Sequence, residues 1–230
     1  MKKRIAVIPG DGIGLDVTPE ALKVLRAIAE TGGHEFVFTE FDWGAERYLA
    51  TGVSLPEGAL DDLRRNYDVV FLGALGDPRV PDMKHATDIL FGLRFGLELY
   101  ANIRPVKLLA PQLTPLRDRS VGDLDFVVVR ENTEGLYSGL EHTIIPGVVE
   151  SLKVVTEHAS LRIARYAFAY ARRHHFDQVC TVHKANILKL SDGLFLDCSR
   201  RIAKEFPEIK YAELIVDNAC MQLVLNPERY

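Results

Sequence analysis

The sequence has no apolar run long enough to span a membrane, few cysteines and no excess of basic residues. Its N-terminal apolar run stops at Ile8, before Pro9-Gly10-Asp11, and is too short for a secretory signal. We therefore expect no membrane partner and a cytoplasmic location, or a matrix location if the protein belongs to an organelle.

The cysteines, Cys180, Cys198 and Cys220, are widely spaced and form no CxxC pair. This pattern argues against a disulfide framework and against a zinc site, so we expect buried thiols. The 28 Lys and Arg residues are outnumbered by 32 Asp and Glu residues, and the net charge is -4 at pH 7. No nucleic-acid partner is expected, although local arginines can still bind a small anion.

The 230 residues, 47% of them hydrophobic, suffice for one large domain or two small ones. Residues 4–8 form an apolar strand that runs into a glycine-rich turn at 10–14, and helical spacing follows as far as Gly32-Gly33. We expect Thr18-Pro19 to cap this helix. The GxGxG spacing differs from the GxGxxG dinucleotide fingerprint, so the glycines can equally serve close packing of strand and helix.

Apolar runs and helical patterns alternate along the rest of the chain, which predicts a mainly parallel α/β sheet. Thr143 to Val155 is different, because two β-rich runs flank Pro146-Gly147 and predict a hairpin arm. A lone hairpin is marginal in water, so we expect it to pack against a partner subunit. The other predicted strands cover 35–41, 68–73, 126–129, 179–182 and 214–216, and the other predicted helices cover 56–65, 88–100, 160–173 and 191–206.

The strand at 126–129 is apolar without alternation, as expected of a strand covered on both faces. A polar cluster follows it directly: Arg130, Glu131, Asn132, Glu134 and Tyr137. Ligand-binding groups often lie at strand ends in α/β proteins. The cluster is therefore either part of a site or a charged surface loop.

Arginines Arg94, Arg104 and Arg130 lie where regular elements end, and guanidinium groups together suit a substrate with several carboxylates. Tyr137 and Lys184 could transfer protons, and Asp217 is a hard oxygen ligand for Mg²⁺ or Mn²⁺. This set fits metal-assisted proton or hydride chemistry on an anionic acid.

Five stretches in the correct order, spanning 4–230, resemble the β-decarboxylating dehydrogenases, the isocitrate and isopropylmalate dehydrogenase family. They are MKKRIAVIPGDGIG, LYANIRP, VVRENTEGLYSG, VHKANILKLSDGLF and IVDNACMQLVLNPERY. The resemblance implies an isopropylmalate dehydrogenase-like two-lobe α/β fold, with a first lobe at 1–104, a second at 105–230 and a dimerisation arm at 138–157. It also implies a homodimer with shared sites, in which Lys184 and Asp217 serve the neighbouring subunit.

The family's reaction is oxidation of a 3-substituted malate at its C2 hydroxyl by hydride transfer to NAD or NADP, followed by decarboxylation. By resemblance, Tyr137 is the acid and Lys184 the base. The arginines Arg94, Arg104 and Arg130 match the carboxylate clamps, Asp217 matches one metal ligand, and Ile13 and Asn186 match positions near the nicotinamide.

The positions that select the substrate lie just before Arg94, where similar isocitrate dehydrogenases carry serine and asparagine. Here they correspond to Asp88 and Leu90, followed by Phe91. The apolar Leu90 favours an aliphatic substituent and hence 3-isopropylmalate. The arm segments at 138–142 and 146–153 look more like NAD-dependent isocitrate dehydrogenase, and homoisocitrate and tartrate stay open.

The family continues past the point where this chain stops, so we expect a fragment lacking roughly the last third of a typical member. That portion carries the remaining metal aspartates and the adenosine-binding loop, which leaves the preference between NAD and NADP open. The alternative from another class is a non-catalytic regulatory subunit or an inactive fragment. Such a subunit should have lost a site residue, whereas Tyr137, Lys184 and the arginines are present.

Overall fold

The computed structural model describes residues 1–230 and divides into two compact units, Met1–Glu98 and Leu99–Tyr230. The lobe boundary predicted after residue 104 falls inside strand β4 (Ala101–Lys107), and the division into functional lobes stays a prediction. As predicted, both units mix helices with parallel strand pairs.

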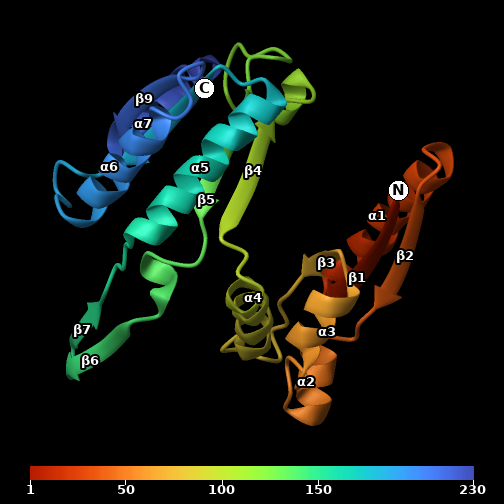
Figure 1. Cartoon of the computed structure of the whole chain (residues 1–230). Coiled ribbons are helices and arrows are strands. Elements are labelled where there is room, and N and C mark those ends of the chain that lie inside the picture. The colour runs from red at the N-terminus through yellow and green to blue at the C-terminus, as the bar shows by residue number, and fades with distance from the viewer. The chain divides into compact units, whose positions relative to one another are not determined.

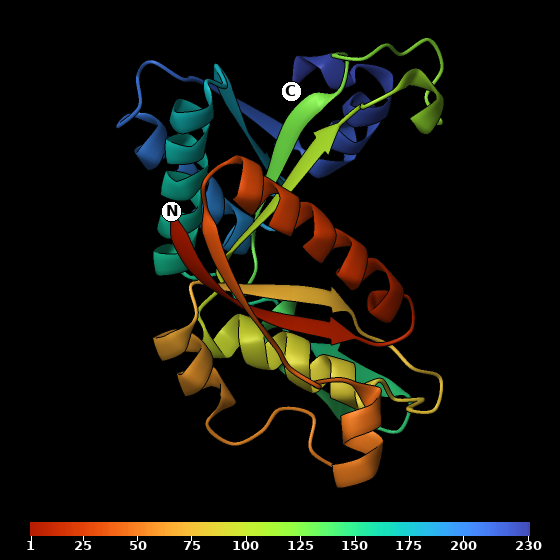
Figure 2. The same ribbon diagram turned by 90° about the vertical axis from the view of Figure 1, so that its right-hand side faces the viewer.

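The first unit is built on β1 (Lys2–Gly10), which pairs in parallel with β2 (Glu35–Glu40) on one side and β3 (Val69–Ala74) on the other. Because successive side chains of a strand point to opposite faces, β1 packs into two apolar clusters. Ala6 and Ile8 contact residues of α3 and α4, while Ile5 and Val7 contact Leu22 of α1. Figure 2 shows α1 and α4 on opposite faces of the sheet. The helices are α1 (Ile13–Thr31), α2 (Ala45–Thr51), α3 (Ala59–Asn66) and α4 (Lys84–Gly96).

Helix α1 begins five residues earlier than Thr18, so the predicted Thr18-Pro19 cap is wrong: Gly12 is the N-cap and Pro19 lies inside the helix. The glycines explain the early start. A Cβ at Gly14 would lie 2.3 Å from the Pro9 carbonyl oxygen, and Gly10 has a φ of +78° beside Ala74. The close-packing interpretation of these glycines is therefore confirmed, since only glycine permits the helix to start against the strand ends.

The second unit contains an antiparallel pair, β4 with β5 (Asp125–Glu131), and a parallel pair, β8 (Gln178–His183) with β9 (Lys210–Ile215). Helix α5 (Glu157–His174) is capped by Thr156, whose side chain accepts from the Ala159 N–H. It packs against α6 (Ser191–Ala203) through a core whose main members are Ala164, Phe168, Ala171, Ile202, Phe206 and Ile209. Short helical turns are η1 (Pro111–Leu113), η2 (Leu136–Ser138) and η3 (Pro227–Arg229), and the last α-helix is α7 (Val216–Leu225).

Strand β5 is less covered than its apolar run predicts. Phe126 is buried, but Val128 is 40% exposed. Strands β5 and β8 each pair on one edge only, and consecutive residues of both line an apolar cavity of about 240 Å³. Consecutive strand residues point to opposite faces, so it is the unpaired edges that border this cavity. None of the predicted site residues lines it.

The predicted hairpin is confirmed as β6 (Glu141–Ile145) paired antiparallel with β7 (Val148–Ser151), with Pro146-Gly147 at the turn. Every residue of both strands is exposed, and Figure 1 shows the hairpin extending beyond the end of α5. The buried-thiol prediction holds for Cys198, whereas Cys180 is half-buried and Cys220 is exposed on α7. Burial raises the pKa of the Cys180 and Cys198 thiols.

Candidate functional site

The antiparallel register of β4 and β5 brings two of the predicted arginines onto one face. Arg130 pairs directly with Asn102, and Arg104 follows Asn102 by two residues on the same strand. Directly paired residues and residues two apart share a face, so the three side chains project together. Arg104 is exposed, and its Nε donates to the Asn102 side-chain oxygen at 2.9 Å. This arrangement leaves the outer end of the Arg104 guanidinium facing solvent.

The Arg130 guanidinium is held between two side chains that follow β5. It donates to the Tyr137 hydroxyl oxygen at 3.2 Å and to the Asn132 side-chain oxygen at 2.8 Å. It also lies over the Tyr137 ring, 5.1 Å from the ring centre. Asn132 is buried and donates to the Leu99 carbonyl, which ties this cluster to the start of β4. The structure thus joins Arg130 to Tyr137 through a loop of only a few residues.

Glu131, the last residue of β5, holds the same loop through its carboxylate, which accepts from the Thr133 N–H, the Thr133 hydroxyl and the Glu134 N–H at 2.6–2.8 Å. Arg162 of α5 adds an ion pair at 3.2 Å. Burial acts to raise the pKa of Glu131, but the hydrogen bonds from Thr133, Glu134 and Arg162 outweigh it and lower that pKa below its usual value. Glu131 is therefore an anchor for the loop rather than a reacting group.

The other pair of predicted site residues is Lys184, directly after β8, and Asp217, in the first turn of α7 directly after β9. Their side chains form an ion pair between Lys184 Nζ and Asp217 Oδ2, with 31% and 68% of the two side chains exposed. The hydrogen bond from Lys184 lowers the pKa of Asp217. Asn186 is exposed two residues beyond Lys184. Parallel pairing of β8 with β9 places both residues at the same edge.

A divalent cation needs several oxygen ligands, and six or more is usual for hard cations. No group of three or more His, Cys, Asp or Glu side chains in the structure could hold a metal ion. Asp217 can supply one carboxylate oxygen, but these 230 residues do not form a metal site by themselves. The predicted metal-ligand role of Asp217 is untested.

The remaining predicted residues, Ile13, Leu90 and Arg94, belong to the first unit. Ile13 is 63% exposed at the start of α1, so an apolar side chain is available there to a flat ring such as nicotinamide. On α4, the Arg94 guanidinium lies 5.1 Å from the Phe91 ring centre, and Leu90 is partly exposed.

Asp88, on the same helix, is already engaged by other side chains. It accepts from Lys84 and from the Ser54 hydroxyl at 2.9 Å. Burial acts to raise its pKa, but these bonds outweigh burial and lower it. Asp88 is thus engaged by other side chains of the protein.

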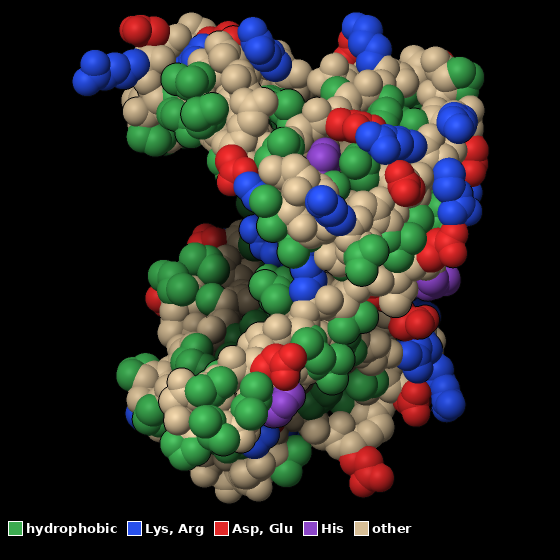
Figure 3. Space-filling model, turned by 90° about the vertical axis from the view of Figure 1, so that its left-hand side faces the viewer, with side chains coloured by type: hydrophobic (Ala, Val, Ile, Leu, Met, Phe, Trp, Pro, Cys, Tyr) green, Lys and Arg blue, Asp and Glu red, His purple; other side chains and the backbone are tan.

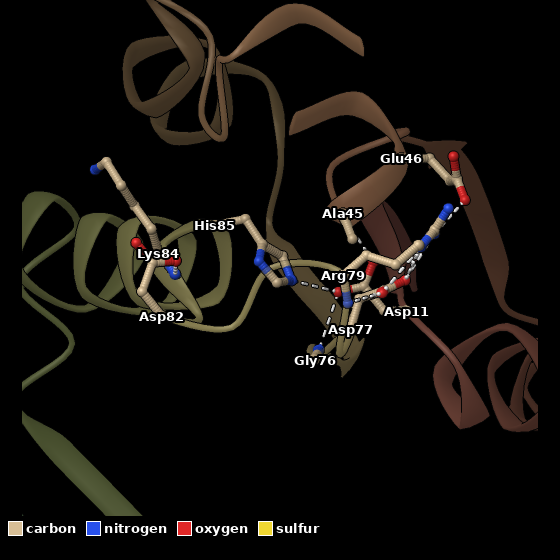
Figure 4. A network of polar contacts seen from close by, with 9 residues as sticks. All are labelled: Asp11, Ala45, Glu46, Gly76, Asp77, Arg79, Asp82, Lys84 and His85. Carbon is tan, nitrogen blue, oxygen red and sulfur yellow. Dashed lines mark hydrogen bonds and ion pairs between the residues drawn. The ribbon is translucent and has the colours of Figure 1, made fainter. Parts of the chain in front are cut away.

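A buried polar network at the end of β1 escaped the sequence analysis. Asp11 accepts from the Ala45 N–H at 2.6 Å and the Gly76 N–H at 2.9 Å, and it contacts His85 Nε2 at 2.9 Å. Figure 4 shows Asp11 at the meeting point of these groups. His85 is fully buried. The partners of Asp11 lie far apart in the sequence, so the glycine-rich turn was the one sequence feature that could have indicated the network.

The face drawn in Figure 3 carries charged side chains of both signs. Along the right-hand edge of the face in Figure 3, basic and acidic side chains alternate. No helix is both long and apolar enough to cross a membrane. The exposed Arg104 and the Lys184–Asp217 pair are therefore the features that best suit a small anionic ligand.

The α/β architecture thus carries two clusters of charged side chains, one of Arg104 and Arg130 beside Tyr137 and one of Lys184 with Asp217. The chain matches the isocitrate/isopropylmalate dehydrogenase family over residues 4–230 and belongs to it.

Similar proteins within the family have different functions. A chloroplastic 3-isopropylmalate dehydrogenase from Solanum tuberosum is 42% identical over 97% of this chain. A mitochondrial protein from Dictyostelium discoideum, named as a regulatory subunit of NAD isocitrate dehydrogenase, is 43% identical over 100% of it. The crystal structure of isocitrate dehydrogenase from Methylococcus capsulatus superposes with a TM-score of 0.82 at 40% identity over 99% of this chain. The chain spans 59%, 59% and 65% of their respective lengths.

Proposed function

We propose that this protein oxidises a 3-substituted malate at its C2 hydroxyl, transfers the hydride to NAD and releases carbon dioxide from the resulting oxo acid. The observation that carries the proposal is the shared face of Arg104 and Arg130, with the Tyr137 hydroxyl held against Arg130 at 3.2 Å. A guanidinium fork binds a carboxylate through two parallel bonds. NADP stays the alternative acceptor.

In this proposal the arginines bind the substrate carboxylates, with Arg94 contributing from α4. Arg104 is best suited to bind a carboxylate of the incoming substrate first, because its outer nitrogens face solvent. Arg130 is best suited to orientation, because Asn132 and Tyr137 already fix its plane. Orientation of the C2 hydrogen towards the cofactor contributes much of the rate in such reactions.

Two proton transfers then fall to Lys184 and Tyr137. Lys184 Nζ takes the proton from the C2 hydroxyl, and NAD, when bound, would supply the acceptor for the C2 hydrogen as hydride. The bond from C3 to its carboxylate then breaks, its electron pair forms an enolate, and Tyr137 gives its hydroxyl proton to C3. The Arg130 bond to Tyr137 uses the phenol oxygen as acceptor, so it does not use that proton.

An ammonium group bonded to Asp217 has no lone pair with which to accept a proton. The base role of Lys184 therefore requires the Lys184–Asp217 pair to open when the site is assembled and the released ammonium to give one proton to water, which leaves a neutral amine. Both side chains are partly exposed, and exposed ion pairs contribute little stability, so opening this one is inexpensive. We propose that Lys184 and Asp217 act in the site of a second copy of the chain.

For the substrate we propose 3-isopropylmalate. The support is Leu90, a partly exposed apolar side chain beside Phe91, while Asp88 is occupied by Lys84 and Ser54. A third substrate carboxylate would find no hydrogen-bond donor in Leu90 and would be repelled by the Asp88 carboxylate. Isocitrate is the second candidate, because the isocitrate dehydrogenases match this chain as well as the isopropylmalate enzyme does. Homoisocitrate and tartrate are further alternatives.

Steady-state rates of NAD reduction with each acid distinguish these substrates. We expect the highest kcat/KM for 3-isopropylmalate, and a higher value for isocitrate would overturn that choice. Arg104→Gln should raise KM, whereas Arg117→Gln, an exposed arginine of the same unit, should leave it unchanged. Absence of NADH formation with all four acids would favour the regulatory-subunit or inactive-fragment alternative.

The proposed homodimer rests on the β6–β7 arm. Its apolar side chains Ile144, Ile145 and Val149 are 56–66% exposed, which is costly for a hairpin that packs on nothing. Removal of 138–157 should lower the sedimentation mass to that of one chain, and an unchanged mass would contradict the arm's role. We propose a cytoplasmic location, with the chloroplastic and mitochondrial compartments named for two of the relatives as alternatives.

A further inference from the structure

One short segment contacts the loop of Tyr137 directly and the turn of Lys184 through Asp192. It is the strap, defined here as Leu152–Thr156, which leads from the end of β7 to the start of α5. It is extended, so alternate residues point in opposite directions. Leu152, Val154 and Thr156 bond to one side, and Lys153 bonds to the other.

On the first side the strap holds the loop of Tyr137. Val154 exchanges both backbone hydrogen bonds with Gly135, at 2.8 and 3.1 Å. Thr156 donates to the Glu134 carboxylate from its N–H at 2.9 Å and from its hydroxyl at 2.7 Å. The Ser138 hydroxyl donates to the Leu152 carbonyl at 3.2 Å. Tyr137 is therefore bracketed by residues that are bonded to the strap.

On the second side Lys153 reaches the carboxylate of Asp192 on α6 and forms an ion pair with its Oδ1. Asp192 is only 7% exposed, and its Oδ2 accepts the backbone N–H of Lys184 at 2.7 Å. The Lys184 carbonyl in turn accepts from the Ile187 and Leu188 N–H groups, which closes a tight turn. A single buried carboxylate thus links the strap to the main chain of Lys184.

A buried carboxylate needs its partners, because an unpaired charge away from water is costly. If Lys153 is removed, the Asp192 carboxylate loses this ion pair and turns towards water, which weakens its bond to the Lys184 N–H. The arm, the loop of Tyr137 and the turn of Lys184 are consequently connected by hydrogen bonds and one ion pair.

We propose that Asp192 is a positioning residue for Lys184 and that Lys153 makes this position depend on the arm. The proposal rests on the proposed function for the chemical role of Lys184. It goes further by naming the route through which docking of the arm reaches the expected base. Neither Lys153 nor Asp192 touches the substrate in this account.

Hydrogen exchange of the Lys184 backbone amide tests the link without any need for activity. Lys153→Met should speed exchange at this amide by about fivefold, the size of one hydrogen bond, although Lys153 does not contact it. Lys153→Arg should restore slow exchange. The matched control is Lys210→Met, which removes another lysine–aspartate pair of the same unit, between Lys210 and Asp177. It should leave the Lys184 amide unchanged.

A second test of the same amide uses Asp192→Asn, with Asp197→Asn on the same helix as its control. If Asp192→Asn does not fold, exchange at the Lys184 amide in the variants of the exposed Lys153 still tests the link. Equal exchange at the Lys184 amide in Lys153→Met and Lys210→Met would overturn the proposal.

In an active preparation, Lys153→Met should lower kcat with KM unchanged, because Lys184 moves a proton and does not bind the carboxylates. A purely structural role would lower thermal stability without this split. If exchange responds as expected but Lys184→Ala leaves NAD reduction intact, the coupling stands and the proposed function fails. If exchange at the Lys184 amide is unchanged in Lys153→Met while Lys184→Ala abolishes activity, the coupling fails and the proposed function stands.

Discussion

Two aspartates that follow parallel strands behave in opposite ways. Asp11 comes directly after β1 in the first unit and is 6% exposed, with partners from α2, from the turn after β3 and from α4. Asp217 comes just after β9 in the second unit, its side chain is 68% exposed, and its side-chain partner is Lys184. The same residue type at the same kind of topological position thus serves two purposes.

The difference lies in how completely the protein satisfies each carboxylate. Asp11 binds elements that are distant in sequence, so its role is to hold the first unit together. Asp217 is bound by one exposed lysine, and such a pair contributes little stability. A carboxylate that stays exposed to solvent can bind a ligand. Burial and saturation with hydrogen bonds therefore separate the structural aspartate from the candidate for chemistry.

The largest expected effect comes from Asp11→Ala. It leaves one buried N–H group, one half-buried N–H group and a buried histidine without their acceptor, which should destabilise the first unit by about 3–5 kcal/mol. Urea unfolding followed by the fluorescence of Trp43, the single tryptophan and buried in this unit, measures the loss. Asp217→Asn should leave the urea midpoint unchanged. Similar midpoint shifts for the two variants would break the comparison.

A smaller effect is expected at the glycine turn. In Gly14→Ala the new methyl would lie 2.3 Å from the Pro9 carbonyl oxygen and 2.8 Å from Ala74, both backbone atoms that cannot step aside. Overpacking of this kind costs about 1–3 kcal/mol. Gly193→Ala on α6 meets nothing within 4 Å and should instead stabilise by up to about 1 kcal/mol. Thermal unfolding should show a lower midpoint temperature for Gly14→Ala and a higher one for Gly193→Ala than for the parent protein.

The smallest effect concerns pH and Glu131, a carboxylate intermediate between the two aspartates. Its pKa is lowered in the folded protein, so it contributes stability above its unfolded value of about 4.5, and that contribution is lost as the pH falls through the folded pKa. The difference in urea midpoint between the protein and Glu131→Gln should be largest at neutral pH and shrink on acidification. A difference that is independent of pH would contradict this.

Local patterns were enough to predict most elements. The apolar runs at 4–8 and 68–73 became β1 and β3, and Pro146-Gly147 between β-rich runs became the turn of the arm. Two helices were missed, since α2 is short and α7 follows β9 without an intervening turn. The cap at Thr18 was wrong because the glycines allow the helix to begin against the strand.

The site was only partly accessible to sequence reasoning. The pairing of Arg130 with Tyr137 joins residues seven apart, so a sequence motif could suggest it. Asp11 and His85 are 74 residues apart, and Lys153 and Asp192 are 39 apart. Contacts of that range depend on how strands and helices pack, and no local pattern encodes them. The metal role of Asp217 and the contribution of Arg94 to a common pocket stay predictions.

The central claim is that the exposed lysine–aspartate pair belongs to the chemistry and not to the fold. The most direct test measures NAD reduction with 3-isopropylmalate and urea unfolding on the same preparation of Lys184→Ala. Loss of a proton-transfer group should lower the rate by about 10²–10⁴-fold while the unfolding midpoint stays that of the parent protein. An unchanged rate, or a loss of rate matched by a loss of stability, would contradict the account.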